Sequence, residues 1–210
     1  MSSAERGSKI SFGWSDVAID FSILLALPLA IIGLQYSAII PTKWIVLDLS
    51  SPSVIAIYGR LFGHISAAHL WANVSWLVVT GLALYGYALW TVDVRSYRTV
   101  MVAGMLGTPI VTASGLWLIY SILGDLPVIA GASDLPLALL GATISLYLRD
   151  IRQPLVATSR PTSFHIWYGV YLLALLASIA ISTLTIGLGP VSETGHLLGF
   201  LVGLILGGFI

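Results

Sequence analysis

The sequence contains no cysteine, and charged residues occupy only 9% of its 210 positions. The lack of cysteine excludes disulfide bonds, thiolate metal sites and a cysteine nucleophile, and it leaves the redox compartment open. The charges cancel to a formal net charge of zero, so the chain has neither the basic field that attracts nucleic acid nor an acidic tail. We therefore expect no nucleic-acid partner.

Apolar residues are in excess, since they make up 58% of the chain and give it a mean hydropathy of +0.99. Soluble domains average about 45–50% apolar residues, so this composition predicts an integral membrane protein whose partners are lipids and other membrane proteins. The polar start, MSSAERGSKISFGWSD, lacks the apolar stretch and small-residue cleavage site of a secretory signal. We expect no removable signal peptide.

A transmembrane helix needs about 20 apolar residues to cross a hydrocarbon core of roughly 30 Å, and six segments meet this need. They span residues 17–40, 67–90, 99–123, 133–148, 165–188 and 194–210. The fourth is short, so we expect it to begin below the membrane surface. Residues 41–63 are apolar enough to lie in the interface as a first loop anchored by Trp44. The sequence thus predicts an all-α membrane protein with a cytoplasmic N-terminal segment at 1–16 and a six-helix transmembrane domain at 17–210.

The distribution of lysine and arginine predicts the orientation of these helices. If both termini are cytoplasmic, the outer segments contain only Lys43 and Arg60. The inner segments then hold the other basic residues, which are Arg6, Lys9, Arg95, Arg98, Arg149, Arg152 and Arg160. Because cytoplasmic loops carry the excess of basic residues, we expect both termini inside a cell, with the protein in its plasma membrane.

Polar residues near the starts of the second, fourth and sixth predicted helices form the candidate site. They are His64, His69 and Asn73 in FGHISAAHLWANVSWL, Ser133 in GASDLP, and His196 in ETGHLLGFLVG. Alternate helices run in opposite directions, so these three helix starts share the outer side and the polar residues can meet. Polar groups inside a membrane are costly, and each is a functional candidate for that reason.

Ser133 has the local sequence of a nucleophile at a helix start. Gly131 permits a sharp turn, while Asp134 and Pro136 suit the first helical turn. Ser133 would then lie beside free backbone N–H groups, which are the donors that an oxyanion requires. The alternative is that Ser133 only caps the helix, and for Asp134 itself we expect a capping role.

A glycine repeat in the last predicted helix would allow a base to approach Ser133. Its members recur every four residues and are Gly195, Gly199, Gly203 and Gly207. Such a stripe lets another helix come close, and the fourth helix offers a small face at Ala138, Gly141, Ala142 and Ser145. Packing of these faces would bring His196 to Ser133 as a general base, whereas a merely packed histidine is the alternative.

His69 and Asn73 are four residues apart and so share one face of a helix. An imidazole and a carboxamide both donate hydrogen bonds, so we expect an oxyanion hole here, with His64 orienting its neighbours or holding water. Hydrogen bonding between helices is the alternative for the pair. Ser114 in TASG is a rival nucleophile, but it lies in the middle of a predicted helix, where no helix start supplies donors.

The order of these motifs resembles the rhomboid intramembrane serine proteases from about residue 17 onward. The resemblance implies a six-helix core with Ser133 as nucleophile, His196 as general base, and an oxyanion hole of His69, Asn73 and the Ser133 amide. No third acid, metal or cofactor is implied. Asp134 departs from the pattern, because the family commonly has glycine after its serine. An acidic residue in the second helix and a tryptophan-arginine pair in the first loop also lack counterparts.

Two functions follow from this interpretation. The first is a serine endopeptidase that cleaves transmembrane segments of other proteins near the outer side of the bilayer. The second is a catalytically silent rhomboid-like protein that binds membrane clients for trafficking or degradation, which Asp134 favours. A channel or transporter ranks third, because the polar residues cluster near one side instead of lining a path through the bilayer.

Overall fold

The structure, a computed structural model, describes residues 14–37, 41–64, 66–91, 94–152, 162–186 and 190–210. In these residues the regular structure is helical except for two short strands. The longer helices are α1 (Trp14–Ser37), α4 (Ala67–Thr91), α5 (Val94–Leu123), α6 (Asp134–Arg152), α7 (Thr162–Ile186) and α8 (Pro190–Phe209). The short elements are α2 (Thr42–Ile45), β1 (Leu47–Asp48), α3 (Val54–Gly59), the 3-10 helix η1 (Arg60–Phe62) and β2 (Val128–Ile129).

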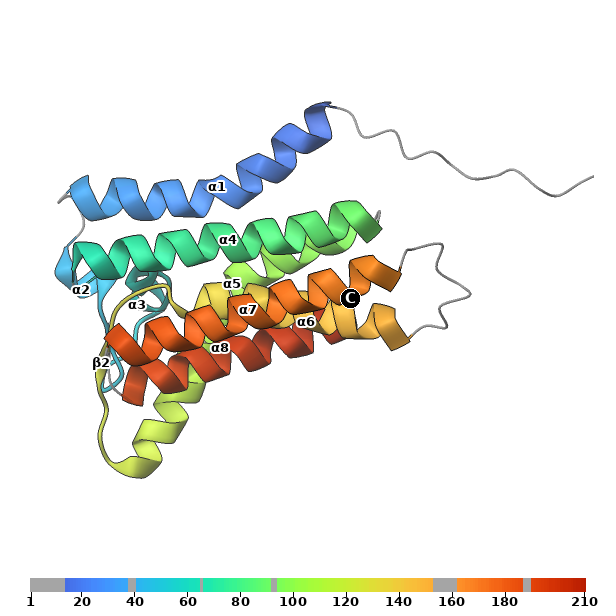
Figure 1. Ribbon diagram of the computed structural model, residues 1–210. Helices are drawn as coiled ribbons and strands as arrows, with labels where there is room; N and C mark the ends of the chain where they lie inside the picture. The colour runs from blue at the N-terminus through green and yellow to red at the C-terminus, as the bar shows by residue number, and fades with distance from the viewer. Residues whose placement is uncertain (1–13, 38–40, 65, 92–93, 153–161, 187–189) are drawn as a thin grey trace, which may run out of the picture.

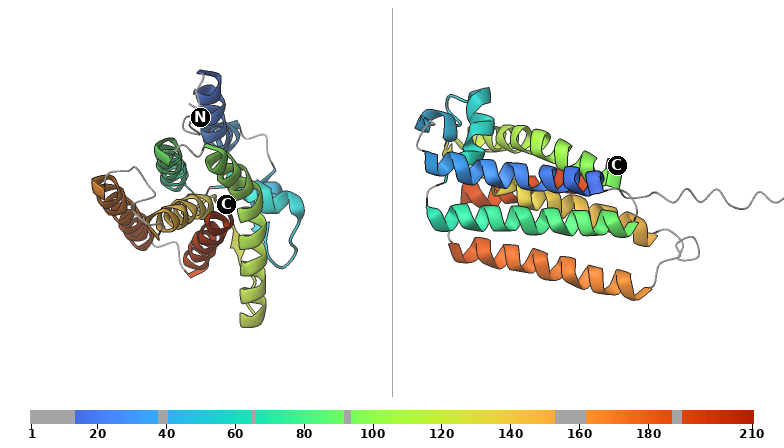
Figure 2. Two further views of the ribbon diagram at one scale, coloured as in Figure 1. Left: turned by 90° about the vertical axis from the view of Figure 1, so that its right-hand side faces the viewer. Right: turned by 90° about the horizontal axis from the view of Figure 1, so that it is seen from above.

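The longer helices run side by side, and α6 lies in the middle of the bundle (Figure 1). In the end-on view of Figure 2, α4, α7 and α8 lie around α6, while α1 lies at the periphery. Every residue of α6 from 134 to 143 is buried. This segment is almost wholly apolar or small, which lets it pack against neighbours on all sides.

The helices agree with an all-α membrane protein. α1, α4, α5 and α7 are long and apolar enough to cross a membrane. α6 has 19 residues and ends with charged side chains, and the apolar part of α8, Glu193–Phe209, is shorter than a typical span. The count of six membrane-spanning helices therefore stays a prediction. The N-terminal segment predicted at 1–16 lies outside the described residues except for 14–16, which belong to α1.

Several helices begin earlier than their apolar segments. α5, α7 and α8 begin at residues 94, 162 and 190, and not at 99, 165 and 194 as hydropathy predicted. In α5 the additional turn carries Arg98, whose guanidinium bonds Asp16 at 3.1 Å and the buried Asp20 at 2.6 Å. Hydropathy identifies only the apolar part of a helix. In α5 Arg98 lies before that part, and its ion pairs join α5 to α1.

The glycine stripe of α8 packs against α6, as the sequence predicted. A Cβ atom at any of three glycines would overlap backbone atoms of α6; the glycines are Gly199, Gly203 and Gly207, which face Asp134, Ala138 and Ala142 in turn. The prediction was wrong for Gly195, where a Cβ atom would meet Leu116 of α5. A step of four residues turns about 40° past a full helical turn, so the stripe winds round α8, and its first member, Gly195, faces α5 instead of α6.

The segment between α1 and α4 is joined to the segment that leads into α6. β1 pairs antiparallel with β2, with Leu47 opposite Ile129. Two residues further on, the backbone N–H of Gly131 donates to the carbonyl oxygen of Arg60 at 2.8 Å. Trp44 is exposed, as an interfacial anchor requires, although the interfacial position of this loop stays a prediction. The first loop therefore fixes the chain immediately before α6.

The close packing of α8 on α6 predicts opposite outcomes for one substitution at two glycines. Gly203→Ala should lower the free energy of unfolding by about 1 to 3 kcal/mol, because its Cβ atom overlaps the Ala138 carbonyl oxygen. Gly86→Ala in α4 is the matched control, since a Cβ atom there meets nothing within 4 Å. It should raise the free energy by up to about 1 kcal/mol through helix propensity. Thermal unfolding in detergent measures the stability of both variants. Equal changes for Gly203→Ala and Gly86→Ala would contradict the close packing of α8 on α6.

Candidate active site

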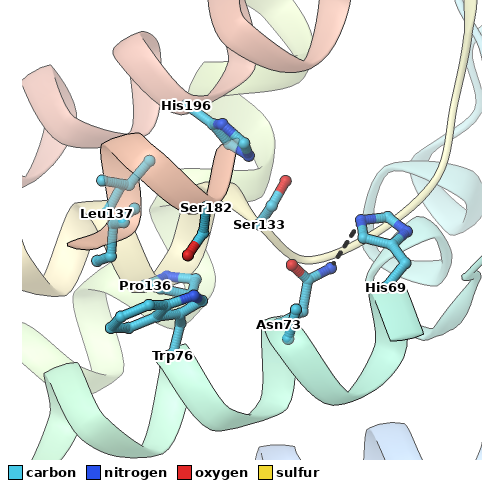
Figure 3. Close-up of a pocket in the computed structure, with 10 residues that line it drawn as sticks. His69, Asn73, Trp76, Ser133, Pro136, Leu137, Ser182 and His196 are labelled. Atoms are coloured by element: carbon cyan, nitrogen blue, oxygen red, sulfur yellow. Dashed lines mark hydrogen bonds between the residues drawn. The ribbon is translucent and has the colours of Figure 1, made fainter. Parts of the chain in front are cut away.

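One cavity brings together residues from the starts of three helices. The starts of α4, α6 and α8 lie at the same end of the bundle (Figure 1). His69 and Asn73 of α4, Ser133 and His196 all line a cavity of about 30 Å³ there (Figure 3). The four site residues predicted from separate sequence motifs therefore line one small, partly open cavity.

The turn before α6 places Ser133 beside His69 and Asn73. Gly131 has a φ of 109°, a conformation that side-chain-bearing residues rarely adopt. A Cβ atom at Gly131 would lie 2.9 Å from Cε1 of His69 and 3.4 Å from Nδ2 of Asn73. Ser133 is half-buried and directly precedes the first residue of α6. Only glycine therefore lets the turn pass this close to the two α4 side chains.

His69 and Asn73 contact each other directly. Asn73 Nδ2 and His69 Nε2 are 3.1 Å apart, and both residues are buried. The contact has two chemically consistent forms, because a carboxamide rotated by 180° presents its oxygen to the ring instead of its nitrogen. When His69 Nε2–H donates to the Asn73 oxygen, the carboxamide N–H groups are left to face Ser133. That form suits an oxyanion hole, with Asn73 as the direct donor and His69 as its support.

His64 lies beside His69 but does not line the cavity. The two imidazole rings meet edge to face with centroids 5.1 Å apart. The backbone N–H of His64 donates to Oε1 of Gln35 in α1 at 3.1 Å. Burial and the nearby His69 lower the pKa of His64 from 6.5 to about 4. A neutral His64 can therefore hold His69 in place by ring contact.

The packing of α8 on α6 positions His196. His196 is half-buried and precedes Gly199 by nearly one helical turn. At Gly199 the backbone of α8 touches the backbone of Asp134, the residue after Ser133. Figure 3 shows the His196 side chain above Ser133 in the same cavity. The glycine stripe thus sets the separation of the two residues.

Asp134 does not cap α6, so the capping prediction was wrong. Its Oδ2 atom forms an ion pair with Nη2 of Arg60 at 2.5 Å and lies 2.5 Å from the Thr112 hydroxyl oxygen. Its Oδ1 atom has no hydrogen-bond partner among the described residues. No sequence motif pairs Arg60, an expected outer basic residue, with Asp134, because the two residues lie 74 positions apart.

Other residues complete the cavity, and some of them were missed in the sequence. Trp76 of α4 and Ile179 and Ser182 of α7 line it beside Ser133. The Ser182 hydroxyl donates to the Ser178 carbonyl oxygen at 2.8 Å. No single motif marks these residues, since their place depends on how α7 packs. The rival Ser114 is exposed and lines a different, apolar pocket with Trp117 of α5 and Leu49 of the first loop.

The chain belongs to the rhomboid family, because the Rhomboid domain matches residues 52–210. The matched segment contains every residue of the candidate site and confirms the resemblance seen in the sequence. The protein is therefore an integral, multi-pass membrane protein of a family whose members are generally serine proteases acting on membrane proteins. Curated proteins give no match to this chain. Among the described residues, no cluster of histidine, aspartate and glutamate side chains could hold a metal ion.

The Gly131 turn predicts a larger cost for alanine there than at another glycine of positive φ. Gly124 has a φ of 74° and open space where a Cβ atom would lie, so Gly124→Ala should lower the free energy of unfolding by about 1 to 2 kcal/mol. Gly131→Ala carries a backbone cost of this kind and also presses on the His69 ring. Thermal unfolding should therefore show a clearly greater loss of stability for Gly131→Ala than for Gly124→Ala. Equal losses would mean that the His69 ring does not lie against Gly131.

We expect the folded protein to lose stability as the pH falls, because of the lowered pKa of His64. Because its pKa is lower in the folded protein than in the unfolded chain, protonation favours unfolding. The stability due to neutral His64 is present above about pH 6.5 and is lost progressively as the pH falls towards 4. We expect His64→Gln to show a smaller fall in melting temperature than the parent between pH 7 and pH 5. Parallel curves for the two proteins would argue against a buried neutral His64.

Proposed function

We propose that the protein is an intramembrane serine endopeptidase in which Ser133 is the nucleophile and His196 is the general base. The observation that carries this proposal is the single cavity lined by Ser133, His196, His69 and Asn73. A serine hydroxyl and an imidazole that line one cavity can act as the nucleophile and the general base of acyl transfer. Membership of the rhomboid family makes a peptide bond within a membrane protein the expected target.

In this mechanism His196 takes the proton of the Ser133 hydroxyl as Oγ attacks the scissile carbonyl carbon. The tetrahedral intermediate collapses when the peptide C–N bond breaks and protonated His196 gives its proton to the leaving amine. Water, deprotonated by His196, then attacks the acyl-enzyme. The proton returns to Ser133 Oγ as the acid product leaves, so that the enzyme is unchanged at the end of the cycle.

The oxyanion formed on the carbonyl oxygen would be stabilised by the Asn73 carboxamide and the backbone N–H of Ser133. The N–H of Leu135 in the first turn of α6 is already engaged by the Ala132 carbonyl oxygen at 3.1 Å. The N–H of Ser133 directly precedes α6, where no earlier helical carbonyl engages it, so it would serve as the backbone donor. His69 supports Asn73 through the contact between their side chains. His64 supports His69 in turn through its ring.

A substrate helix must unwind before it can react, because its carbonyl groups are engaged by its own backbone. The cavity holds little more than a water molecule, so the substrate strand needs space that movement of its walls would provide. Trp76 and Ile179 form walls on α4 and α7, and entry between these helices would bring the strand to Ser133. With both termini cytoplasmic and the protein in the plasma membrane, cleavage would occur near the outer side.

The alternative is a catalytically silent rhomboid-like protein that binds membrane clients. Asp134 favours it, because the family commonly has glycine after the serine and a free carboxylate there would oppose the oxyanion. The ion pair with Arg60 weakens this objection, since it balances the carboxylate charge. A silent protein would bind a transmembrane client without cleaving it.

Cleavage of a model transmembrane substrate in lipid vesicles tests the proposal. The parent should cleave, Ser133→Ala and His196→Ala should not, and Asn73→Ala should reduce turnover by about 10- to 1,000-fold while remaining folded. Ser114→Ala is the matched control and should keep parental turnover, because Ser114 is exposed and lines a different pocket. Binding of the substrate by a folded parent without cleavage would establish the silent alternative.

A further inference from the structure

A buried polar cluster lies beneath the turn that carries Ser133. Arg60, Thr112 and Asp134 are each at most 3% exposed. Nη2 of Arg60 donates to Asp134 Oδ2 at 2.5 Å and to Thr112 Oγ1 at 2.8 Å. The Thr112 hydroxyl has one proton, which goes either to Asp134 Oδ2 or to the Thr108 carbonyl oxygen. The cluster joins the first loop, α5 and the start of α6.

Arg60 contacts the chain on both sides of Ser133. Two residues before the serine, Nη1 of Arg60 donates to the Gly131 carbonyl oxygen at 3.1 Å, and the Arg60 carbonyl oxygen accepts from the Gly131 N–H at 2.8 Å. One residue after the serine, Nη2 pairs with Asp134. The planar fork of a guanidinium suits this arrangement, since its branches bond two groups at fixed separation.

Stability alone is a weak reason for this cluster. Nε of Arg60 and Oδ1 of Asp134 are buried without a hydrogen-bond partner among the described residues. Removing two charges from water is costly, and well-packed apolar residues of similar volume are often as stable as a buried ion pair. The cluster offers what an apolar pair lacks, namely directional bonds to both flanks of one residue.

We propose that Arg60 is a positioning residue for Ser133, acting through Gly131 and Asp134 with Thr112 as the third corner. This inference rests on the proposed function. Arg60 fixes the backbone on both sides of the serine and so sets the direction of its hydroxyl towards His196. It also balances the Asp134 carboxylate, which would otherwise be an unpaired negative charge beside the site where the oxyanion forms.

The rate at which a fluorophosphonate labels the purified, folded protein tests this role, because labelling depends on the geometry of the nucleophile. Arg60→Met should label about 100-fold more slowly than the parent at a temperature well below its melting transition. Arg60→Lys keeps the charge but cannot bond both flanks, and we expect it to label about tenfold more slowly. Adding Asp134→Asn to Arg60→Met should recover part of the rate by removing the unpaired charge.

The matched control is Arg98→Met, which breaks the ion pair with buried Asp20 at the other end of the bundle. It should lower the melting temperature but change the labelling rate by less than about twofold, since distant sites act independently. If Arg60→Met does not fold, Arg60→Lys and Thr112→Val replace it in the experiment. Each should be labelled more slowly than the parent.

Two outcomes would overturn the inference, and they are distinguishable. If the parent is labelled and the folded Arg60 and Thr112 variants are labelled at the parental rate, the cluster is structural only and the proposed function stands. If the folded parent is not labelled, the proposed function fails and the positioning role fails with it. We expect Arg60→Met and Arg98→Met both to lower the melting temperature, but only the Arg60 and Thr112 variants, and not Arg98→Met, to be labelled more slowly than the parent.

Discussion

Contact between the backbones of α8 and α6 is the constraint on which the candidate site depends. Three glycines on α8 leave room for the α6 backbone, and any side chain there would separate the helices. His196 and Ser133 lie at one end of this seam, so the distance between the helices sets the distance between the two side chains. A serine and a histidine more than sixty positions apart in the sequence can share a cavity of about 30 Å³ only because of this contact.

The start of α6 needs a second constraint, because helix packing fixes the helix but not the turn before it. The first loop provides this constraint through β1 pairing with β2 and through the bonds between Arg60 and Gly131. The positive φ of Gly131 then brings the turn against His69 and Asn73. Ser133 is thus held from one side by α8 and from the other by the first loop and α4.

Much of the fold was predictable from the sequence, since long apolar segments, a glycine stripe and alternating helix direction are local or periodic signals. The family resemblance was confirmed, whereas the catalytic roles of Ser133 and His196 stay predictions. The ion pair between Arg60 and Asp134 was not predictable, because a charge in the sequence does not reveal its partner across 74 positions. The early start of α5 was missed for a similar reason, since Arg98 finds Asp20 only after α1 packs.

We propose that the packing of α6, α8 and the first loop makes Ser133 the reactive serine of this protein. The most direct measurement is to treat the folded protein with a fluorophosphonate and to map the modified residue by peptide mass spectrometry. We expect one adduct, on Ser133. An adduct on Ser114 or Ser182, or a folded protein with no adduct, would contradict it.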